Sequence, residues 1–197
     1  MYFSIITTDN LMYEEARSFF LSQWRSDLLS RAPSSLVWAY LVTKYMRDHW
    51  KSHFSFMHWV YFCEELYFST SHSEDLLAIA IDPKRVAVDL EYIRPRDESL
   101  LKEVHVPDSP FSPWENFYLQ RCAKECLIKY HTLQHEQMHE IQVNAYVWNH
   151  HLAVQWWEFD SLLLISHRWK EYAVHTVIRD WKVLALLHKD WIWYWSF

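Results

Sequence analysis

The chain has no glycine among its 197 residues, although average usage of about 7% would supply roughly 14. Glycine lacks a Cβ atom, so it is the usual residue in left-handed turns and wherever the backbone approaches a ligand closely. Natural enzymes seldom do without it. The absence therefore marks this composition as unusual for a natural sequence.

Cysteine is scarce as well. Cys63, Cys122 and Cys126 form an odd set without the spacing of a zinc ribbon, so we interpret them as reduced thiols of a cytosolic protein. No apolar run approaches the roughly 20 residues that a membrane-spanning helix needs, and residues 1–8 lack the basic region of a signal peptide. From these absences we expect a cytoplasmic protein without a membrane partner.

Positive charge is also in deficit. The formal net charge is −6 and the isoelectric point is near 6.1, which argues against a nucleic-acid partner, because a nucleic-acid binder shows a basic face. A hydrophobic share of 51% and an aromatic share of 18% exclude a disordered chain. At 197 residues, the chain can bury a real core as one large domain or as two small lobes.

Hydrophobic periodicity and turn residues predict the order of the elements. Helices are expected at residues 13–24, 35–49 and 114–131, with a short one from 97 through 104. Strands are expected near residues 2–7, 54–61, 66–70, 76–81, 85–90, 141–148, 152–159 and 162–167. The aromatic segment 190–197 is expected to dock on the fold.

Carboxylates gather on two of these elements. Asp89 and Glu91 are two residues apart on an expected strand, so they project to the same face. Glu125 and Lys129 are i,i+4 neighbours on an expected helix. Three carboxylates suit magnesium, a hard ion that binds through a few carboxylates plus substrate phosphates. Together the two segments predict a site that holds a divalent cation against a polyphosphate, although each alone also fits solvated surface charges.

A third segment lies upstream, where Phe68 to Ser73 ends in Ser-His-Ser. With Ala87 to Glu91 and Arg121 to Lys129, it resembles the 4′-phosphopantetheinyl transferases, in which a Phe-x-x-Ser-His-Ser turn precedes an Asp-x-Glu strand and a Lys-Glu-x-x-x-Lys helix. The order and spacing are similar to the two-lobed, surfactin-synthetase-activating type. The resemblance extends over nearly the whole chain.

This resemblance implies an α+β fold of two similar lobes, each a small, mainly antiparallel sheet packed on a long helix, arranged as a pseudodimer. Residues 1–93 would form the N-terminal lobe, with the coenzyme A side, the Ser-His-Ser turn and the Asp-x-Glu strand. Residues 94–197 would form the C-terminal lobe with the Lys-Glu helix. The protein is expected to be a monomer.

The implied reaction is magnesium-dependent transfer of the 4′-phosphopantetheine group from coenzyme A to a serine of an acyl or peptidyl carrier protein. By resemblance, Asp89 and Glu125 bind the Mg²⁺ ion directly, and Glu91 binds it directly or through water. Glu125 is also the candidate base for the serine proton. The other implied roles belong to Lys129 at the phosphate under attack, and to Lys124, Ser71 and His72 at the remaining phosphates of coenzyme A.

The chain departs from the family pattern mainly at the phosphate contacts. Arg121 stands at the family's tryptophan, Ala87 at a glycine, Glu64-Glu65 at a glycine-lysine pair, and Ser34 at a phosphate-binding arginine. These departures keep open a second function, a non-catalytic or weakly active scaffold of the same fold. The missing glycine, together with 13 tryptophans and 13 histidines, supports a further hypothesis, that of an engineered or computationally generated member of the family.

One competing motif is the segment His135 to His139, which matches the His-Glu-x-x-His signature of zinc peptidases through its Glu136. The signature needs a helix centred on the two histidines and a third ligand downstream, for which Glu140 or Glu158 is available. The resemblance predicts a loop before a strand here instead. In a chain with 13 histidines, coincidence explains the match better, so zinc proteolysis is a remote alternative.

Overall fold

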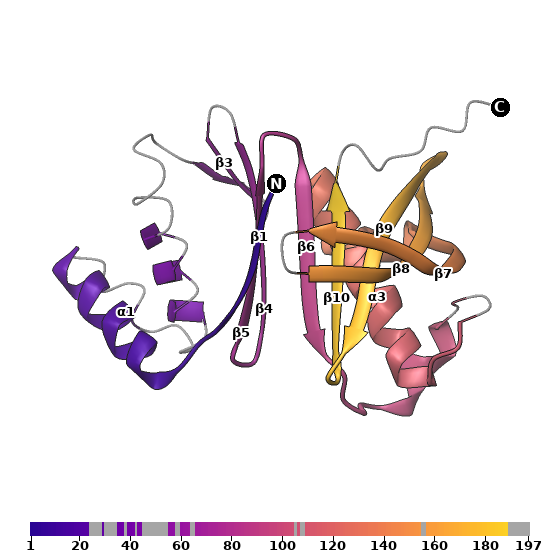
Figure 1. Cartoon of the computed structure of the whole chain (residues 1–197), viewed down its shortest axis with the longest axis horizontal. Coiled ribbons are helices and arrows are strands. Elements are labelled where there is room, and N and C mark those ends of the chain that lie inside the picture. The colour runs from indigo at the N-terminus through magenta and orange to yellow at the C-terminus, as the bar shows by residue number, and fades with distance from the viewer. Residues whose placement is uncertain are drawn as a thin grey trace.

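Figure 1 shows the computed structural model of the chain, which describes residues 1–23, 29, 35–37, 39–41, 43–44, 55–57, 60–63, 66–104, 106, 109–154 and 157–188. The elements are β1 (Tyr2–Thr7), α1 (Asn10–Ser22), β2 (Ser55–Met57), β3 (Val60–Cys63), β4 (Leu66–Ser73), β5 (Leu76–Asp82), β6 (Val86–Tyr92), η2 (Glu98–Glu103), α3 (Pro113–His131), η3 (His135–Glu140), β7 (Gln142–Val154), β8 (Trp157–His167), β9 (Lys170–Arg179) and β10 (Lys182–His188). Helical turns also occur within residues 35–44.

The strands of the described residues form two five-stranded sheets. The first has the order β1-β5-β4-β3-β2 and the second the order β6-β10-β9-β8-β7. Every neighbouring pair is antiparallel. The expected α+β class with mainly antiparallel sheets is therefore confirmed.

The two sheets lie face to face, with helices on the outer face of each (Figure 1). Between the sheets, Phe3, Val88 and Phe159 belong to one buried apolar cluster. On the other face of the first sheet, Phe68 and Ile79 belong to a second buried cluster, on the side where α1 lies. Because both faces of the first sheet are covered, all residues of β5 are buried, which explains why its sequence reads as an apolar run rather than an alternation.

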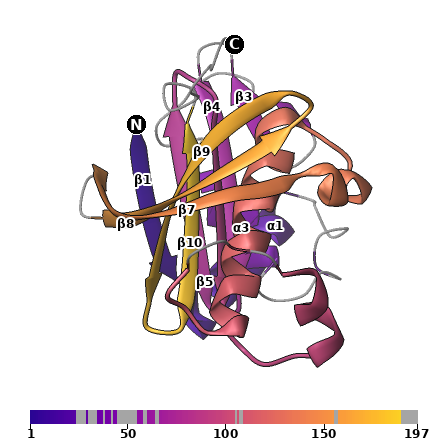
Figure 2. The ribbon, with the colours of Figure 1, turned by 90° about the vertical axis from the view of Figure 1, so that its right-hand side faces the viewer.

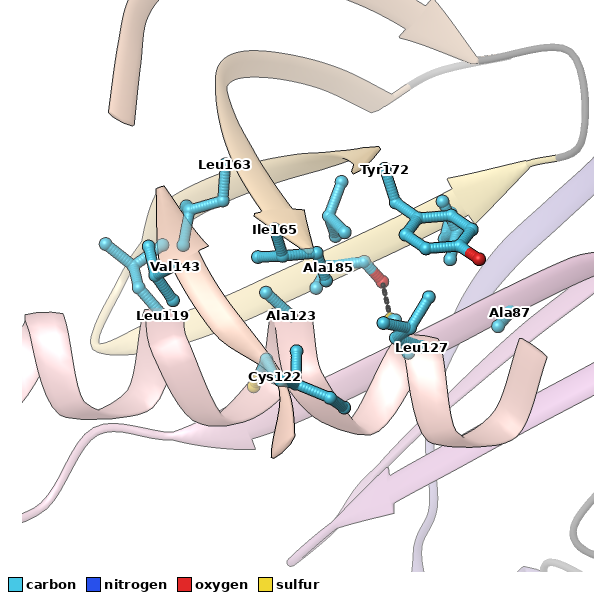
Figure 3. Close-up of a cluster of buried hydrophobic side chains, with 14 of the residues drawn as sticks. Ala87, Leu119, Cys122, Ala123, Leu127, Val143, Leu163, Ile165, Tyr172 and Ala185 are labelled. Carbon is cyan, nitrogen blue, oxygen red and sulfur yellow. Dashed lines mark hydrogen bonds between the residues drawn. The ribbon is translucent and has the colours of Figure 1, made fainter. Parts of the chain in front are cut away.

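Helix α3 covers the outer face of the second sheet (Figure 2). Figure 3 shows its apolar stripe, which includes Leu119, Ala123 and Leu127, packed against Ile165 and Ala185 of the sheet. All five side chains are fully buried, and burial of a leucine of this kind contributes about 1.5–3 kcal/mol. The opposite, more polar side of the helix is thus free to carry charged residues toward β4 and β6.

The ends of α3 follow from its sequence. Ser112 is the N-cap and forms a reciprocal capping box with Glu115, and Pro113 occupies the first turn, where its missing N–H is not needed. At the other end, Thr132 adopts the left-handed conformation with φ 56°. This C-cap position is usually glycine, so the glycine-free composition has a direct structural cost here.

Non-glycine residues also form the hairpin turns of the second sheet. Arg168 and Trp169 join β8 to β9 with φ values of 47° and 68°, and Asp180 and Trp181 join β9 to β10 with φ values of 49° and 60°. Two consecutive positive φ values indicate turns of type I′, for which Asn-Gly is the usual sequence. The side chains of the two tryptophans are exposed, so packing does not compensate for the backbone strain.

The sequence-based strand prediction was wrong in the second half of the chain. It ended at residue 167 and missed β9 and β10, because neither hairpin turn contains the glycine or asparagine that marks such turns. The strands expected at 141–148 and 152–159 have other boundaries in the structure. A single strand, β7, covers residues 142–154 and pairs with β8 with two register shifts. The strand expected near 54–61 is two strands, β2 and β3.

The change from the first sheet to the second occurs at residues 83–85, between β5 and β6. Strand β6, expected in the N-terminal lobe, pairs with β10 in the second sheet. The division into domains at residue 93 stays a prediction. Ser34, Glu64-Glu65, the remainder of the expected 35–49 helix and the segment 190–197 lie outside the described residues.

Among the helices in the described part of the chain, none combines the length and apolar character that crossing a membrane requires.

Candidate functional site

A row of serines on β4 joins the first sheet to β6. Ser69, Ser71 and Ser73 alternate along the strand and therefore share one face. The Val88 amide donates to Ser69 Oγ at 3.0 Å, and the Tyr92 amide donates to Ser73 Oγ at 3.2 Å. Since β6 is an edge strand of the second sheet, its outward amides need partners. The serine hydroxyls supply them.

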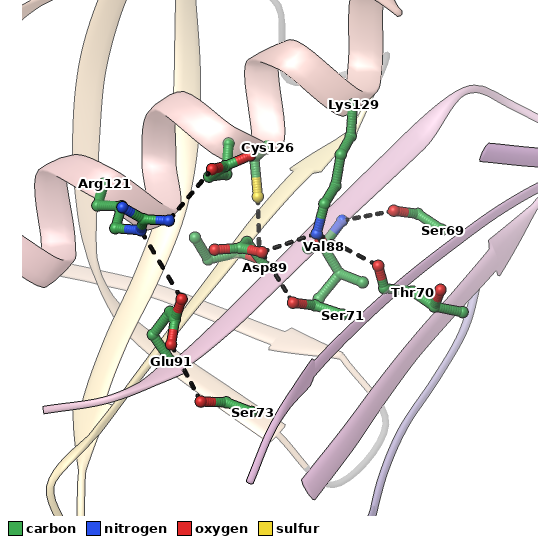
Figure 4. Close-up of polar contacts among 12 residues, drawn as sticks. Ser69, Thr70, Ser71, Ser73, Val88, Asp89, Glu91, Arg121, Cys126 and Lys129 are labelled. Atoms are coloured by element: carbon green, nitrogen blue, oxygen red, sulfur yellow. Dashed lines mark hydrogen bonds and ion pairs between the residues drawn. The ribbon is translucent and has the colours of Figure 1, made fainter. Parts of the chain in front are cut away.

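The same serines reach the carboxylates of β6 (Figure 4). Ser71 Oγ donates to Asp89 Oδ1 at 2.8 Å, and Ser73 Oγ donates to Glu91 Oε2 at 3.0 Å. Both strands place these side chains two residues apart, so each hydroxyl meets one carboxylate. The Ser-His-Ser segment was expected as a turn, but it is the end of β4, and the turn follows at residues 74–75.

Lys129 of α3 lies where helix and both sheets meet. Its Nζ donates to Asp89 Oδ1 at 2.7 Å, to the Val88 carbonyl at 3.0 Å and to the Thr70 carbonyl at 3.2 Å. An ammonium group has three protons, so these oxygens account for all of them. Burial by itself lowers the pKa of Lys129, but the charge and hydrogen bond of Asp89, with the smaller effects of Cys126 and Glu125, together outweigh burial and raise the pKa. Lys129 is thus a buried, charged residue of α3 that connects this helix to β4 and β6.

Arg121, one helical turn before Glu125, reaches the other two carboxylates. Its Nε lies 3.7 Å from Glu91 Oε1, and its Nη2 lies 3.7 Å from Glu125 Oε1. Glu125 Oε1 is also 2.8 Å from His135 Nε2. Arg121 thus lies against Glu91 and Glu125, and Lys129 lies against Asp89, so each of the three carboxylates already faces a basic side chain of the chain itself.

Burial and neighbouring carboxylates raise the pKa of two groups in this cluster. Burial, followed by the charge of Asp89, raises the pKa of Glu91. Burial, followed by the charges of Asp89 and Glu91, raises the pKa of the Cys122 thiol well above its ordinary value. Asp89 Oδ2 is buried and receives no hydrogen bond from the described residues. Such an orphaned carboxylate oxygen is costly unless a cation or a proton donor satisfies it.

The cluster as it stands does not fit a magnesium ion. Its oxygen atoms are of the right chemistry, and Asp89 Oδ2 is available, but Mg²⁺ demands near-octahedral geometry. Arg121 lies against Glu91 and Glu125, and Lys129 and Ser71 take up Asp89 Oδ1. Within the described residues, no group of three His, Cys, Asp or Glu side chains is arranged to hold a metal ion.

Two of the expected coenzyme A contacts lie apart from the cluster. His72 is exposed and, by the alternation of β4, lies on the opposite face of the strand from Ser71 and Ser73. The pKa of His72 is lowered, first by partial burial of the ring and then by the charge of Lys129. Burial lowers the pKa of Lys124, whose charged neighbour is Glu103. The charge that acts on Lys124 is thus that of Glu103 and not that of the carboxylates of β6.

The His-Glu-x-x-His segment forms the 3₁₀-helix η3 rather than an α-helix or the expected loop. With three residues per turn, side chains four apart point in directions about 120° apart, so His135 and His139 do not share a face. His135 contacts Glu125, and His139 Nδ1 lies 2.6 Å from the Glu136 carbonyl oxygen. This geometry does not favour the zinc-peptidase alternative.

No family model and no curated protein matches the chain. The resemblance to the transferases therefore rests on the motif residues alone.

Sequence reasoning missed two parts of the cluster. It assigned no role to Ser69 and Ser73, although the repeat of serine at every second position of a strand is a visible sign of a polar face. It treated Arg121 as a departure from a tryptophan and as one of several candidate cations, without a contact to the carboxylates. Its position four residues before Glu125 did indicate a contact between the two side chains, but the contact with Glu91 depends on how α3 packs on β6.

Proposed function

We propose that the chain transfers the 4′-phosphopantetheine group of coenzyme A to a serine hydroxyl of an acyl or peptidyl carrier protein. One observation supports this proposal above the others: Ser71 and Lys129, from two of the three motif segments, both donate to the same oxygen of Asp89, which comes from the third. Motifs that match by chance have no reason to meet. The proposal includes a two-lobed transferase fold, built on the two sheets and their outer helices.

In the proposed reaction, the serine oxygen attacks the phosphorus atom that bears the pantetheine arm, and 3′,5′-adenosine bisphosphate leaves. Glu125, at 14% side-chain exposure, accepts the serine proton directly or through one water. Arg121, at 31%, is the cation of the cluster best able to reach the pyrophosphate. Lys129 contributes its buried charge without direct contact, because its three protons are already donated. No step is assigned to a metal ion.

A second candidate is a scaffold of the same fold without turnover. One observation favours it: the charged residues of the cluster are paired with each other, and Lys129 is fully committed to protein oxygens. A cluster of this kind stabilises the contact between the sheets whether or not a substrate is present. The two candidates differ in chemistry but not in fold, so only an activity measurement separates them.

The decisive experiment incubates the chain with coenzyme A, magnesium and a panel of apo acyl and peptidyl carrier proteins. Mass spectrometry of the carrier then detects the phosphopantetheine adduct. We expect the parent to form the adduct and Glu125→Gln, which removes the base without changing the shape of the side chain, to slow it by about 10²-fold or more. The matched control is Glu158→Gln, which changes an exposed glutamate of β8 and should leave transfer unchanged.

Transfer by the parent that is lost with Glu125→Gln and kept with Glu158→Gln supports the transferase. No adduct on any carrier, from a parent shown to be folded by circular dichroism, supports the scaffold instead. Equal rates for the parent and Glu125→Gln would mean that a different group accepts the serine proton.

A further inference from the structure

Arg121 occupies the space between Glu91 and Glu125, two of the carboxylates that a divalent ion would need. Its guanidinium nitrogens lie 3.7 Å from an oxygen of each (Figure 4). The arginine side chain is 31% exposed, whereas the two glutamates are 22% and 14% exposed. Arg121 is thus the most exposed of the three side chains, although its Nε atom is itself buried and forms no hydrogen bond within the described residues.

The charges of the cluster are nearly balanced without any added ion. Asp89, Glu91 and Glu125 face the basic residues Arg121 and Lys129, which leaves one unit of negative charge among these five residues. His135, beside Glu125, and Arg96, whose charge also acts on Glu91, are further basic neighbours. A divalent ion would leave the cluster net positive and would compete with Arg121 for the same oxygens. If an uncharged residue replaced Arg121, these residues would carry two units of negative charge, which the charge of a divalent ion would neutralise.

We propose that Arg121 is a built-in substitute for a divalent cation. The parent chain keeps its carboxylates together without a metal ion, and neutralising Arg121 converts Asp89, Glu91 and Glu125 into a divalent-cation site. A second observation points the same way: Asp89 Oδ2 is buried and accepts no hydrogen bond of good geometry within the described residues, its nearest potential donor being the weakly donating Cys122 thiol beside this carboxylate. This inference concerns cation binding and does not depend on transfer activity.

The test measures Mn²⁺ binding by electron paramagnetic resonance, because Mn²⁺ prefers the same oxygen ligands as Mg²⁺ and its free and bound forms are distinguished directly. The proteins are the full-length parent, Arg121→Gln and Arg121→Lys. We expect Arg121→Gln to bind one Mn²⁺ roughly tenfold or more tightly than the parent, because one positive charge beside two ligands is gone. Arg121→Lys keeps that charge and should bind as weakly as the parent.

Two controls make the result specific. The double variant Arg121→Gln/Glu125→Gln loses a ligand and should lose the Mn²⁺ site. Thermal melting provides a separate readout, since a ligand that binds only the folded state raises the melting temperature: Mn²⁺ should stabilise Arg121→Gln and leave the parent unchanged. Even if a variant folds poorly, the Mn²⁺ affinity of the parent tests whether the parent cluster binds a divalent ion. Tight Mn²⁺ binding by the parent that Glu125→Gln abolishes would overturn the inference, as would equal affinities of a folded Arg121→Gln and the parent.

Discussion

Replacing Lys129 by methionine should destabilise the protein severely, although a methionine side chain of similar length fills the same space. The substitution leaves Asp89, whose side chain is 7% exposed, without its cation, and it leaves the carbonyls of Thr70 and Val88 without a shared donor. Removing one partner of a buried ion pair costs about 3–5 kcal/mol. For a chain of this size, 1 kcal/mol corresponds to a shift of about 2–4 °C in melting temperature, so we expect Lys129→Met to melt about 10 °C lower.

The assay is urea denaturation followed by circular dichroism and tryptophan fluorescence, on the parent and on two further variants. Lys124→Met is the matched control: it makes the same change on the same helix, away from the three oxygens that hold Lys129, and should cost about 1 kcal/mol or less. Lys129→Met/Asp89→Asn removes both charges and should recover part of the loss, because the uncompensated charge is the main cost. A free energy of unfolding for Lys129→Met within about 1 kcal/mol of the parent would refute the structural role of Lys129.

Two further predictions concern the missing glycines and pH. Trp169 has φ 68° and is fully exposed, so Trp169→Gly should raise stability by about 1 kcal/mol by removing left-handed strain, whereas Trp169→Ala keeps a Cβ atom and should not; a loss of melting temperature with glycine would contradict the type I′ turn. Burial, followed by the neighbouring His150, lowers the pKa of His175 to about 3. Because the folded pKa lies below the unfolded value of about 6.5, stability is present above that value and is lost as pH falls through it, by about 2 kcal/mol between pH 7 and pH 5. His175→Gln should flatten this part of the stability profile, and an unchanged slope would assign the acid sensitivity to other groups.

Local patterns in the sequence were sufficient for several parts of the fold. The capping residues Ser112 and Glu115 and the apolar stripe of α3 identify the long helix, since helix signals act between residues three or four apart. The Asp89-x-Glu91 alternation likewise predicted two carboxylates on one face of a strand. Class and secondary structure were therefore readable wherever the deciding interactions are local.

The hairpins of the second sheet show where local patterns failed. Arg168-Trp169 and Asp180-Trp181 take up positive φ values that their residue types disfavour. The pairing of β8, β9 and β10 imposes this conformation, because the buried faces of these strands stabilise the sheet by more than the turns cost. A sequence without turn glycines therefore concealed two strands.

The sequence by itself determined which residues can carry charge chemistry in this protein: two carboxylates on one strand face, and a glutamate and a lysine on one helix face. Only the tertiary structure decided what those charges meet. Packing of α3 against β6 sets Lys129 on Asp89 and Arg121 between Glu91 and Glu125, and packing of β4 on β6 brings Ser71 and Ser73 to the same carboxylates. Apart from the local pair Arg121 and Glu125, residues 18 to 40 positions apart make these contacts. Their distances depend on how layers stack, which no spacing along the chain specifies.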